Sequence, residues 1–160
     1  MLTRNGRLVA AGLGVLAVVA AGCSSDPHLP EITFFADGDT VATGPTTYCS
    51  LDFTECRTGS TAELPVRVGS PLQVSLPTDI GDAPWRLLTT YRTPAGADEI
   101  TQQYFRPGER LAVTVTPPDP SAQLTGVEVQ LPSGATDADG NPIARATWSV
   151  RTDPTPVSAS

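Results

Sequence analysis

The residues of this 160-residue chain that could carry chemistry are three cysteines, one histidine and a set of acidic side chains. Cys23 follows an apolar run, residues 8–22, which is preceded by Arg4 and Arg7. A basic start, an apolar stretch and small residues before the cut are typical of an export signal. The ending Val-Ala-Ala-Gly-Cys indicates a bacterial lipobox, so we expect residues 1–22 to be a lipoprotein signal peptide. Cys23 is then the lipid attachment site, with its thiol joined to diacylglycerol.

Two other readings of this segment stay open. Ala20 stands where a lipobox more often has a branched aliphatic residue, so a plain secretory signal cut near residues 18–20 is an alternative. A membrane-spanning anchor is the weakest option, because the 15 residues of 8–22 are fewer than the roughly 20 apolar residues that a span needs.

Cys49 and Cys56 are the remaining thiols, and we expect them to form a disulfide. An exported chain matures where disulfides persist, and closing so short a loop stabilises a fold by roughly 2–3 kcal/mol. The alternative is a redox or metal pair. That use favours the C-x-x-C spacing, whereas six residues separate these two cysteines.

An enzymatic role is tested by elimination. The only histidine, His28, falls in the segment 23–30, which we predict to be a polar, proline-punctuated tether after the lipid. The chain has no lysine, and its cysteines are already assigned, so Ser-His-Asp, Cys-His, Schiff-base and zinc chemistry all lack residues in the folded domain. Paired carboxylates remain, as in glycosidases, although no spacing singles out a pair. We therefore expect a non-enzyme without cofactors.

The one weak metal candidate is the oxygen-rich sequence Asp137-Ala138-Asp139-Gly140-Asn141. Asp137, Asp139 and Asn141 match part of a calcium loop, but Trp148 occupies the twelfth position, where such a loop needs a bidentate glutamate. Asp, Gly and Asn also favour tight turns. A hairpin turn is the preferred interpretation and a calcium site the alternative.

The charge balance excludes one class of partner. Arg4 and Arg7 leave with the signal, so the mature chain keeps eight arginines against 17 acidic residues. No basic patch is present that could neutralise phosphates, so nucleic acid is not expected as a partner. Membrane association should come from the N-terminal acyl chains, palmitate among them.

The elements that position these residues are short strands. Apolar residues alternate with polar ones in many runs, and Pro or Gly turns separate the runs. We read the run around Leu64 and the run around Leu72 as the two strands of one hairpin, and residues 43–56 as a loop or irregular edge. The predicted strands are residues 31–37, 64–68, 72–76, 84–92, 98–105, 111–115, 127–131 and 145–151.

These strands predict an all-β fold, an antiparallel immunoglobulin-like β-sandwich of about seven to nine strands. A small β-barrel is the alternative. The sandwich would span residues 31–152, and residues 153–160 would form a disordered tail.

Several side chains have expected places in this sandwich. Trp85 and Trp148 belong to the core, and the odd-numbered polar residues of 145–151 face water. Arg86 and Arg92 form surface ion pairs. The disulfide loop, with Tyr48, Asp52, Phe53 and Glu55, is either a rigid binding surface or a stapled connection with one aromatic in the core.

With these segments in view, the chain resembles a family of actinobacterial lipoproteins of unknown function. The likeness lies in the lipobox and in the order of the segments PEITFFADG, YCSLDFTEC, PWRLLTTYR and LPSGATDADGNPIARATWSVRT. It implies an envelope lipoprotein with one small β-rich domain and no catalytic residues to carry over.

The sequence thus predicts a lipid-anchored protein on the extracytoplasmic face of the membrane. We expect a non-enzymatic binding module that recognises an envelope protein or cell-wall material through its loops. The alternatives are a carboxylate-dependent hydrolase of envelope polysaccharide and a carrier of an apolar ligand.

Overall fold

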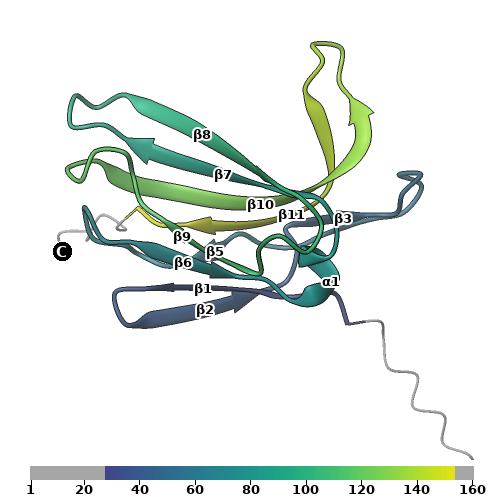
Figure 1. Cartoon of the computed structure of the whole chain (residues 1–160), viewed down its shortest axis with the longest axis horizontal. Helices are drawn as coiled ribbons and strands as arrows, with labels where there is room; N and C mark the ends of the chain where they lie inside the picture. Colours follow the sequence, from purple (N-terminus) through teal and green to yellow (C-terminus); the bar gives the residue numbers. More distant parts are fainter. Residues whose placement is uncertain (1–27, 154–160) are drawn as a thin grey trace, which may run out of the picture.

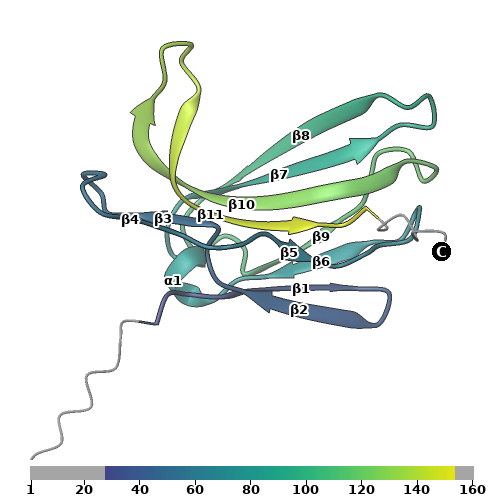
Figure 2. The ribbon, with the colours of Figure 1, turned by 180° about the vertical axis from the view of Figure 1, so that it is seen from behind.

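The computed structural model describes residues 28–153, which form two β-sheets packed face to face (Figures 1 and 2). The predicted signal segment 1–22, Cys23 and the tail after Asp153 lie outside the described residues. The elements are β1 (Ile32–Ala36), β2 (Asp39–Thr43), β3 (Thr47–Cys49), β4 (Cys56–Thr58), β5 (Ala62–Glu63), β6 (Leu72–Ser75), α1 (Thr78–Gly81), β7 (Trp85–Arg92), β8 (Asp98–Phe105), β9 (Ala112–Val115), β10 (Gln123–Thr136) and β11 (Pro142–Arg151).

The strand order is that of an immunoglobulin-like sandwich. One sheet has the order β2-β1-β6-β9, and the other has the order β4-β3-β11-β10-β7-β8, with β5 added in parallel to β11. The strands β1, β5 and β6–β11 follow the immunoglobulin-like plan. The first strand of that plan is divided between the two sheets as β1 and β5. Strands β2, β3 and β4 are additional. The predicted fold class is confirmed, and the two sheets do not close into a barrel.

Alternating side chains from both sheets fill the core. Ile32 and Phe34 of β1 are fully buried, whereas Phe35, the next residue after Phe34, is 44% exposed, as period-2 geometry requires. Trp85 and Trp148 are both buried, as predicted. The other large, fully covered side chains are Val66, Leu72, Val74, Ile80, Leu87, Leu124, Val129 and Val150.

The stretch between β1 and β5 is what this chain adds to the immunoglobulin-like plan. Within it, β2 extends the four-stranded sheet, and the β3–β4 hairpin extends the seven-stranded sheet beyond β11. Residues 43–56, read from the sequence as a loop or irregular edge, therefore include a regular antiparallel hairpin. Its strands are short, and the pattern of polar residues concealed them.

The predicted hairpin between the runs at Leu64 and Leu72 is wrong. The backbone N–H groups of Leu64 and Val66 donate to the carbonyls of Arg151 and Thr152, so the first run follows β11 in the seven-stranded sheet. The second run, β6, pairs with β1 and β9 in the other sheet. Val68, two residues after the buried Val66, is 56% exposed. Both runs contribute to one core, so alternation alone could not assign them to a sheet.

Hydrogen bonds from Arg67 to the Asp37 carboxylate hold the β1–β2 turn, and they predict that the stability of the fold depends on pH. Asp37, at φ 53°, accepts hydrogen bonds from the Arg67 backbone N–H (2.8 Å) and the Arg67 guanidinium (2.9 Å). The guanidinium hydrogen bond, then the backbone bond, lowers the pKa of Asp37 from 3.8 to about 2. A lowered folded-state pKa stabilises the fold above the unfolded pKa, and this contribution is lost as the pH falls from about 3.8 towards 2.

We expect Arg67→Ala to raise the pKa of Asp37 towards 3.8, as measured by NMR titration of its carboxyl carbon. Arg92→Ala, which removes a different surface arginine, is the matched control and should leave the Asp37 titration in place. A wild-type Asp37 that already titrates near 3.8 would contradict this account of the turn.

Candidate functional site

A cleft of about 430 Å³ opens at the end of the sandwich where β1 begins and where α1 and the β3–β4 hairpin lie (Figure 1). Five separate segments of the chain build it. The lining residues are His28, Leu29, Pro30, Tyr48, Ser50, Glu55, Arg57, Asp79, Ile80, Leu131 and Arg145.

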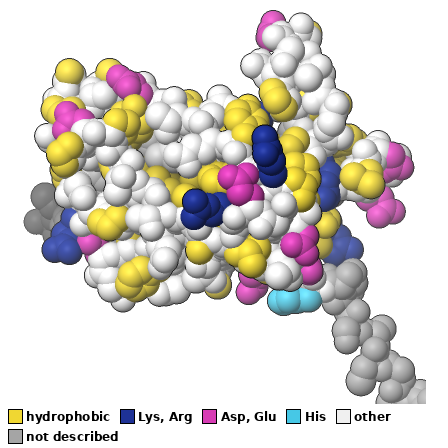
Figure 3. Space-filling model, in the orientation of Figure 1, with side chains coloured by type: hydrophobic (Ala, Val, Ile, Leu, Met, Phe, Trp, Pro, Cys, Tyr) yellow, Lys and Arg dark blue, Asp and Glu magenta, His cyan; other side chains and the backbone are white. Residues whose placement is uncertain are grey.

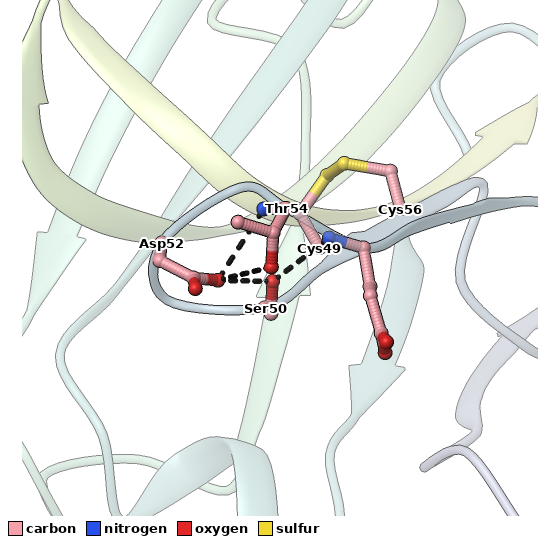
Figure 4. The surroundings of a disulfide bond; sticks show 6 residues. Cys49, Ser50, Asp52, Thr54 and Cys56 are labelled. Atoms are coloured by element: carbon pink, nitrogen blue, oxygen red, sulfur yellow. Dashed lines mark hydrogen bonds between the residues drawn. A yellow bond between two sulfur atoms is a disulfide. The ribbon is translucent and has the colours of Figure 1, made fainter.

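One face of the β3–β4 hairpin forms a wall of this cleft. Tyr48 pairs across the hairpin with Arg57, and Cys49 pairs with Cys56. The Ser50 N–H donates to the Glu55 carbonyl (2.8 Å), which continues the pairing. Successive residues of a strand alternate in direction, so the pairs Tyr48–Arg57 and Ser50–Glu55 share the cleft side. Figure 4 shows the disulfide on the opposite side of the hairpin from Ser50.

The predicted disulfide between Cys49 and Cys56 is present and staples this hairpin (Figure 4). Replacing both cysteines by serine should lower the free energy of unfolding by roughly 2–3 kcal/mol, because a crosslink removes conformations from the unfolded chain. A thermal melt of the double variant under non-reducing conditions measures this. An unchanged midpoint would show that the hairpin holds without the crosslink. Wild type in reductant is the matched comparison.

The tip of the hairpin is ordered by side-chain hydrogen bonds. The Asp52 carboxylate accepts from the Ser50 hydroxyl (2.6 Å) and the Thr54 hydroxyl (2.9 Å) (Figure 4). These bonds, the one from Ser50 first, hold the pKa of Asp52 below its usual value. Leu51 and Phe53 project from the same tip and are 77% and 39% exposed. The hairpin therefore presents two apolar side chains on a braced loop.

Aromatic contacts tie the hairpin to the core. Tyr48 lies edge-on to Trp148, with ring centroids 6.3 Å apart and an interplanar angle of 80°. The Trp148 indole Nε1–H donates to the Pro30 carbonyl at 2.9 Å. One buried tryptophan thus fixes both the hairpin wall and the chain segment that enters β1.

Arg145 reaches the cleft through an irregularity in β11. Leu131 pairs with Ala146, but Pro132 pairs with Ala144, so Arg145 is an extra residue on β11. A β-bulge of this kind redirects a side chain. The Arg145 guanidinium carbon lies 5.9 Å from the centre of the Tyr48 ring, and the side chain is half-buried. Arg145, predicted to face water with its odd-numbered neighbours, is partly covered and lines the cleft.

Charged groups of both signs line the cleft without pairing. Within residues 28–153, no ion pair involves Arg57, Arg145, Glu55 or Asp79. An unpaired guanidinium beside an aromatic ring suits recognition of a carboxylate or phosphate. The side chains that line the cleft could therefore bind a charged group.

His28, which the sequence predicts to belong to the tether, lies at the rim of this cleft. Its side chain is 87% exposed, and its Nε2 lies 3.9 Å from Glu31 Oε1. The serine that lines the same cleft, Ser50, donates its hydroxyl proton to Asp52. The described residues therefore contain no assembled Ser-His pair.

Comparison with known proteins fixes the family. A family model described as "Protein of unknown function (DUF2771)" matches residues 25–153. The chain belongs to this family. Uncharacterized proteins of Mycobacterium tuberculosis and Mycobacterium bovis are each 40% identical to it over 148 residues, which cover 89% of this chain and 88% of theirs. No solved structure matches the chain.

The resemblance to a family of unknown function is confirmed at that level, and lipidation stays a prediction. The part of this DUF2771 chain that the structure describes contains no helix with the length and apolar character needed to cross a membrane.

The weak calcium candidate of this DUF2771 chain forms the turn of the β10–β11 hairpin. Asp137 Oδ1 accepts from the backbone N–H groups of Asp139 (3.0 Å) and Asn141 (2.8 Å), and Gly140 has φ 84°. These bonds, led by the backbone N–H of Asn141, hold the pKa of Asp137 below its usual value. Across residues 28–153, no three His, Cys, Asp or Glu side chains gather as metal ligands would.

Arg86 does not form the predicted surface ion pair. It is 8% exposed, its Nε donates to the Gln130 side-chain carbonyl, and its Nη2 donates to the Pro142 carbonyl at 2.9 Å. The Gln130 amide in turn donates to Glu128. The start of β11 covers this arginine, which strand periodicity alone could not reveal. Arg92 does form its ion pair, with Asp98 at 2.9 Å.

Proposed function

We propose that this protein is lipid-anchored through Cys23 on the extracytoplasmic face of the cell membrane, and that it is a non-enzymatic module binding another envelope protein through the cleft. Export and lipidation rest on the signal-like residues 1–22 and the lipobox. The Cys49–Cys56 disulfide suits an oxidising compartment.

The observation that carries the binding role is the position of Arg57 and Arg145 on two sides of Tyr48. Tyr48 pairs with Arg57 across the hairpin, and the Arg145 guanidinium stands over the Tyr48 ring. Arginine and tyrosine are enriched among the residues that dominate protein interfaces. Glu55 and Asp79 add acceptors for a basic group, so the partner segment would carry charges of both signs.

Apolar side chains around the cleft favour a protein partner. Leu51 and Phe53 stand on the hairpin tip next to Ser50, and Ile143, 37% exposed, stands two residues before Arg145. Exposed apolar side chains near charged ones are a common feature of interaction surfaces.

The anchor would also place the cleft close to the membrane. Five residue steps separate Cys23 from His28 at the cleft rim, a reach of about 18 Å at most. A partner bound in the cleft would therefore itself lie at the membrane surface. This favours a membrane-associated protein over material deep in the cell wall.

A pull-down from envelope membranes tests the proposal. We expect wild type to recover a specific protein that Arg145→Glu and Arg57→Glu fail to recover. Arg110→Glu, with the same charge change outside the cleft, is the matched control and should keep the partner. Recovery unaffected by both cleft variants would contradict the assignment, as would retention of polysaccharide in place of protein.

One observation favours a hydrolase as the second candidate. Glu55 and Asp79 line the same cleft, and glycosidases act through two carboxylates on either side of a bond. Release of reducing sugars from purified cell-wall polysaccharide, lost in both Glu55→Gln and Asp79→Asn, would support this reading. The carrier of an apolar ligand has less support, because charged side chains line the cleft.

A further inference from the structure

The outer edge of β8 is the feature of this fold that the proposed function leaves unexplained. β8 ends the seven-stranded sheet, and β7 is its only partner among the described strands. The other edge of β8 therefore presents unpaired backbone N–H and C=O groups, which form a template for another strand.

After the acidic residues Asp98 and Glu99 at its start, this edge lacks the features that normally prevent pairing. Residues 100–105 include no charged residue, no proline and no glycine. All eight β7–β8 pairs continue in one register, so no bulge twists the edge away. Proteins usually protect long edges with charges, prolines or bulges. The edge from Ile100 to Phe105 is therefore open to pairing with another strand.

Two large apolar side chains stand on one face of this edge. Ile100 and Tyr104 are each 62% exposed. Their partners on β7, Thr90 and Arg86, lie on the outer face of the sheet, so Ile100 and Tyr104 share that face. Figure 3 shows further hydrophobic side chains reaching the surface between the two sheets, with basic and acidic side chains among them.

We propose that β8 is a dimerisation edge, on which β8 of a second copy of this chain pairs antiparallel about a twofold axis at Gln102. If this twofold axis is perpendicular to the sheet, the outer faces of the two copies lie on the same side of the joined sheet. Ile100 then lies opposite Tyr104 of the second copy. Asp98, which pairs with Arg92 of its own chain, lies opposite Arg106 of the second copy, the first residue after β8. Apolar and oppositely charged cross-strand pairs both stabilise a sheet.

If the two β8 strands pair in a neighbouring register, Ile100 no longer lies opposite Tyr104 of the second copy. With the axis at residue 103, Ile100 would lie opposite Arg106 of the second copy. With the axis at residue 101, Ile100 would lie opposite Gln102 of the second copy. The sequence of β8 is therefore self-complementary in one register.

The dimer is compatible with both chains on one membrane. The same twofold axis leaves the two four-stranded sheets on the same side of the joined sheet, and β1, the first strand, belongs to that sheet in each copy. β8 contributes nothing to the cleft wall, so dimerisation and cleft binding are separable.

Cysteine crosslinking of the full chain in its envelope tests the register. Gln102→Cys should give a covalent dimer on a non-reducing gel, because residue 102 meets its own copy at the axis. Ile100→Cys is the matched control. Its two copies would be four residues apart along the strands, about 14 Å, which is too far for a disulfide. Wild type controls for the native cysteines.

Light scattering of the purified chain gives the second readout. We expect twice the chain mass for wild type and loss of the dimer in Gln102→Lys, which opposes two like charges at the axis. Thr40→Lys on the exposed edge strand β2 should stay dimeric. A monomeric wild type, or equal crosslinking by Gln102→Cys and Ile100→Cys, would overturn the proposal and leave the edge to a strand from another protein.

Discussion

Replacing Trp148 by alanine is expected to lower the free energy of unfolding by about 3–5 kcal/mol. Trp148 is fully buried in the core, packs edge-on against Tyr48, and donates its indole N–H to the Pro30 carbonyl. The substitution removes a large apolar volume and leaves the partly buried Pro30 carbonyl without its donor, and both effects destabilise the fold. Urea denaturation followed by circular dichroism measures the change.

Two further variants keep this test informative. Trp148→Phe retains much of the packing and loses the hydrogen bond, so we expect a smaller cost of about 1–3 kcal/mol. Phe53→Ala, at the half-exposed hairpin tip, should change stability by less than about 1 kcal/mol. A Trp148→Ala protein as stable as Phe53→Ala would contradict the central position of this tryptophan.

Replacing Cys23 by alanine is expected to move the protein from the membrane fraction to the soluble fraction. Acyl chains contribute about 0.8 kcal/mol per buried methylene, and two chains are needed for stable attachment. Residues 23–160 hold eight arginines against 17 acidic residues, so their net charge would not attract anionic lipid headgroups. Fractionation of cells followed by immunoblotting measures the change, and metabolic labelling with palmitate gives an independent readout.

The double variant Cys49→Ser, Cys56→Ser is the matched control for thiol loss. It should remain in the membrane fraction, since it removes two cysteines without touching the attachment site. Retention of Cys23→Ala in membranes would contradict the lipid anchor, as would wild type without incorporated palmitate.

The fold class was predictable because burial imposes period-2 alternation on each strand. β1, β7 and β11 show this, with Ile32, Leu87 and Trp148 inward. Pairing partners were less predictable. The runs at Leu64 and Leu72 obey the same alternation but lie in different sheets, because both sheets share one core and the sequence pattern records only burial.

The cleft was only partly predictable, because it is assembled from segments far apart in the chain. For the disulfide loop with Tyr48 and Glu55, the sequence predicts either a rigid binding surface or a stapled connection. Asp79 and Arg57 gave no signal, since each stands alone in a polar stretch. The alternation predicts that Arg145 faces solvent and does not indicate its place in the cleft, because the bulge opposite Pro132 is invisible in the periodicity. That proline within a strand was the one available hint.

Photo-crosslinking in living cells tests the central claim, that the cleft end is the binding surface of an anchored module. A photoreactive amino acid at Phe53 should crosslink to one envelope protein, and Arg145→Glu should abolish that product. The same probe at Ala95, in the β7–β8 turn at the far end of the sandwich (Figure 1), should give no such product. Equal crosslinking from both ends, or a product at Phe53 that survives Arg145→Glu, would contradict the account.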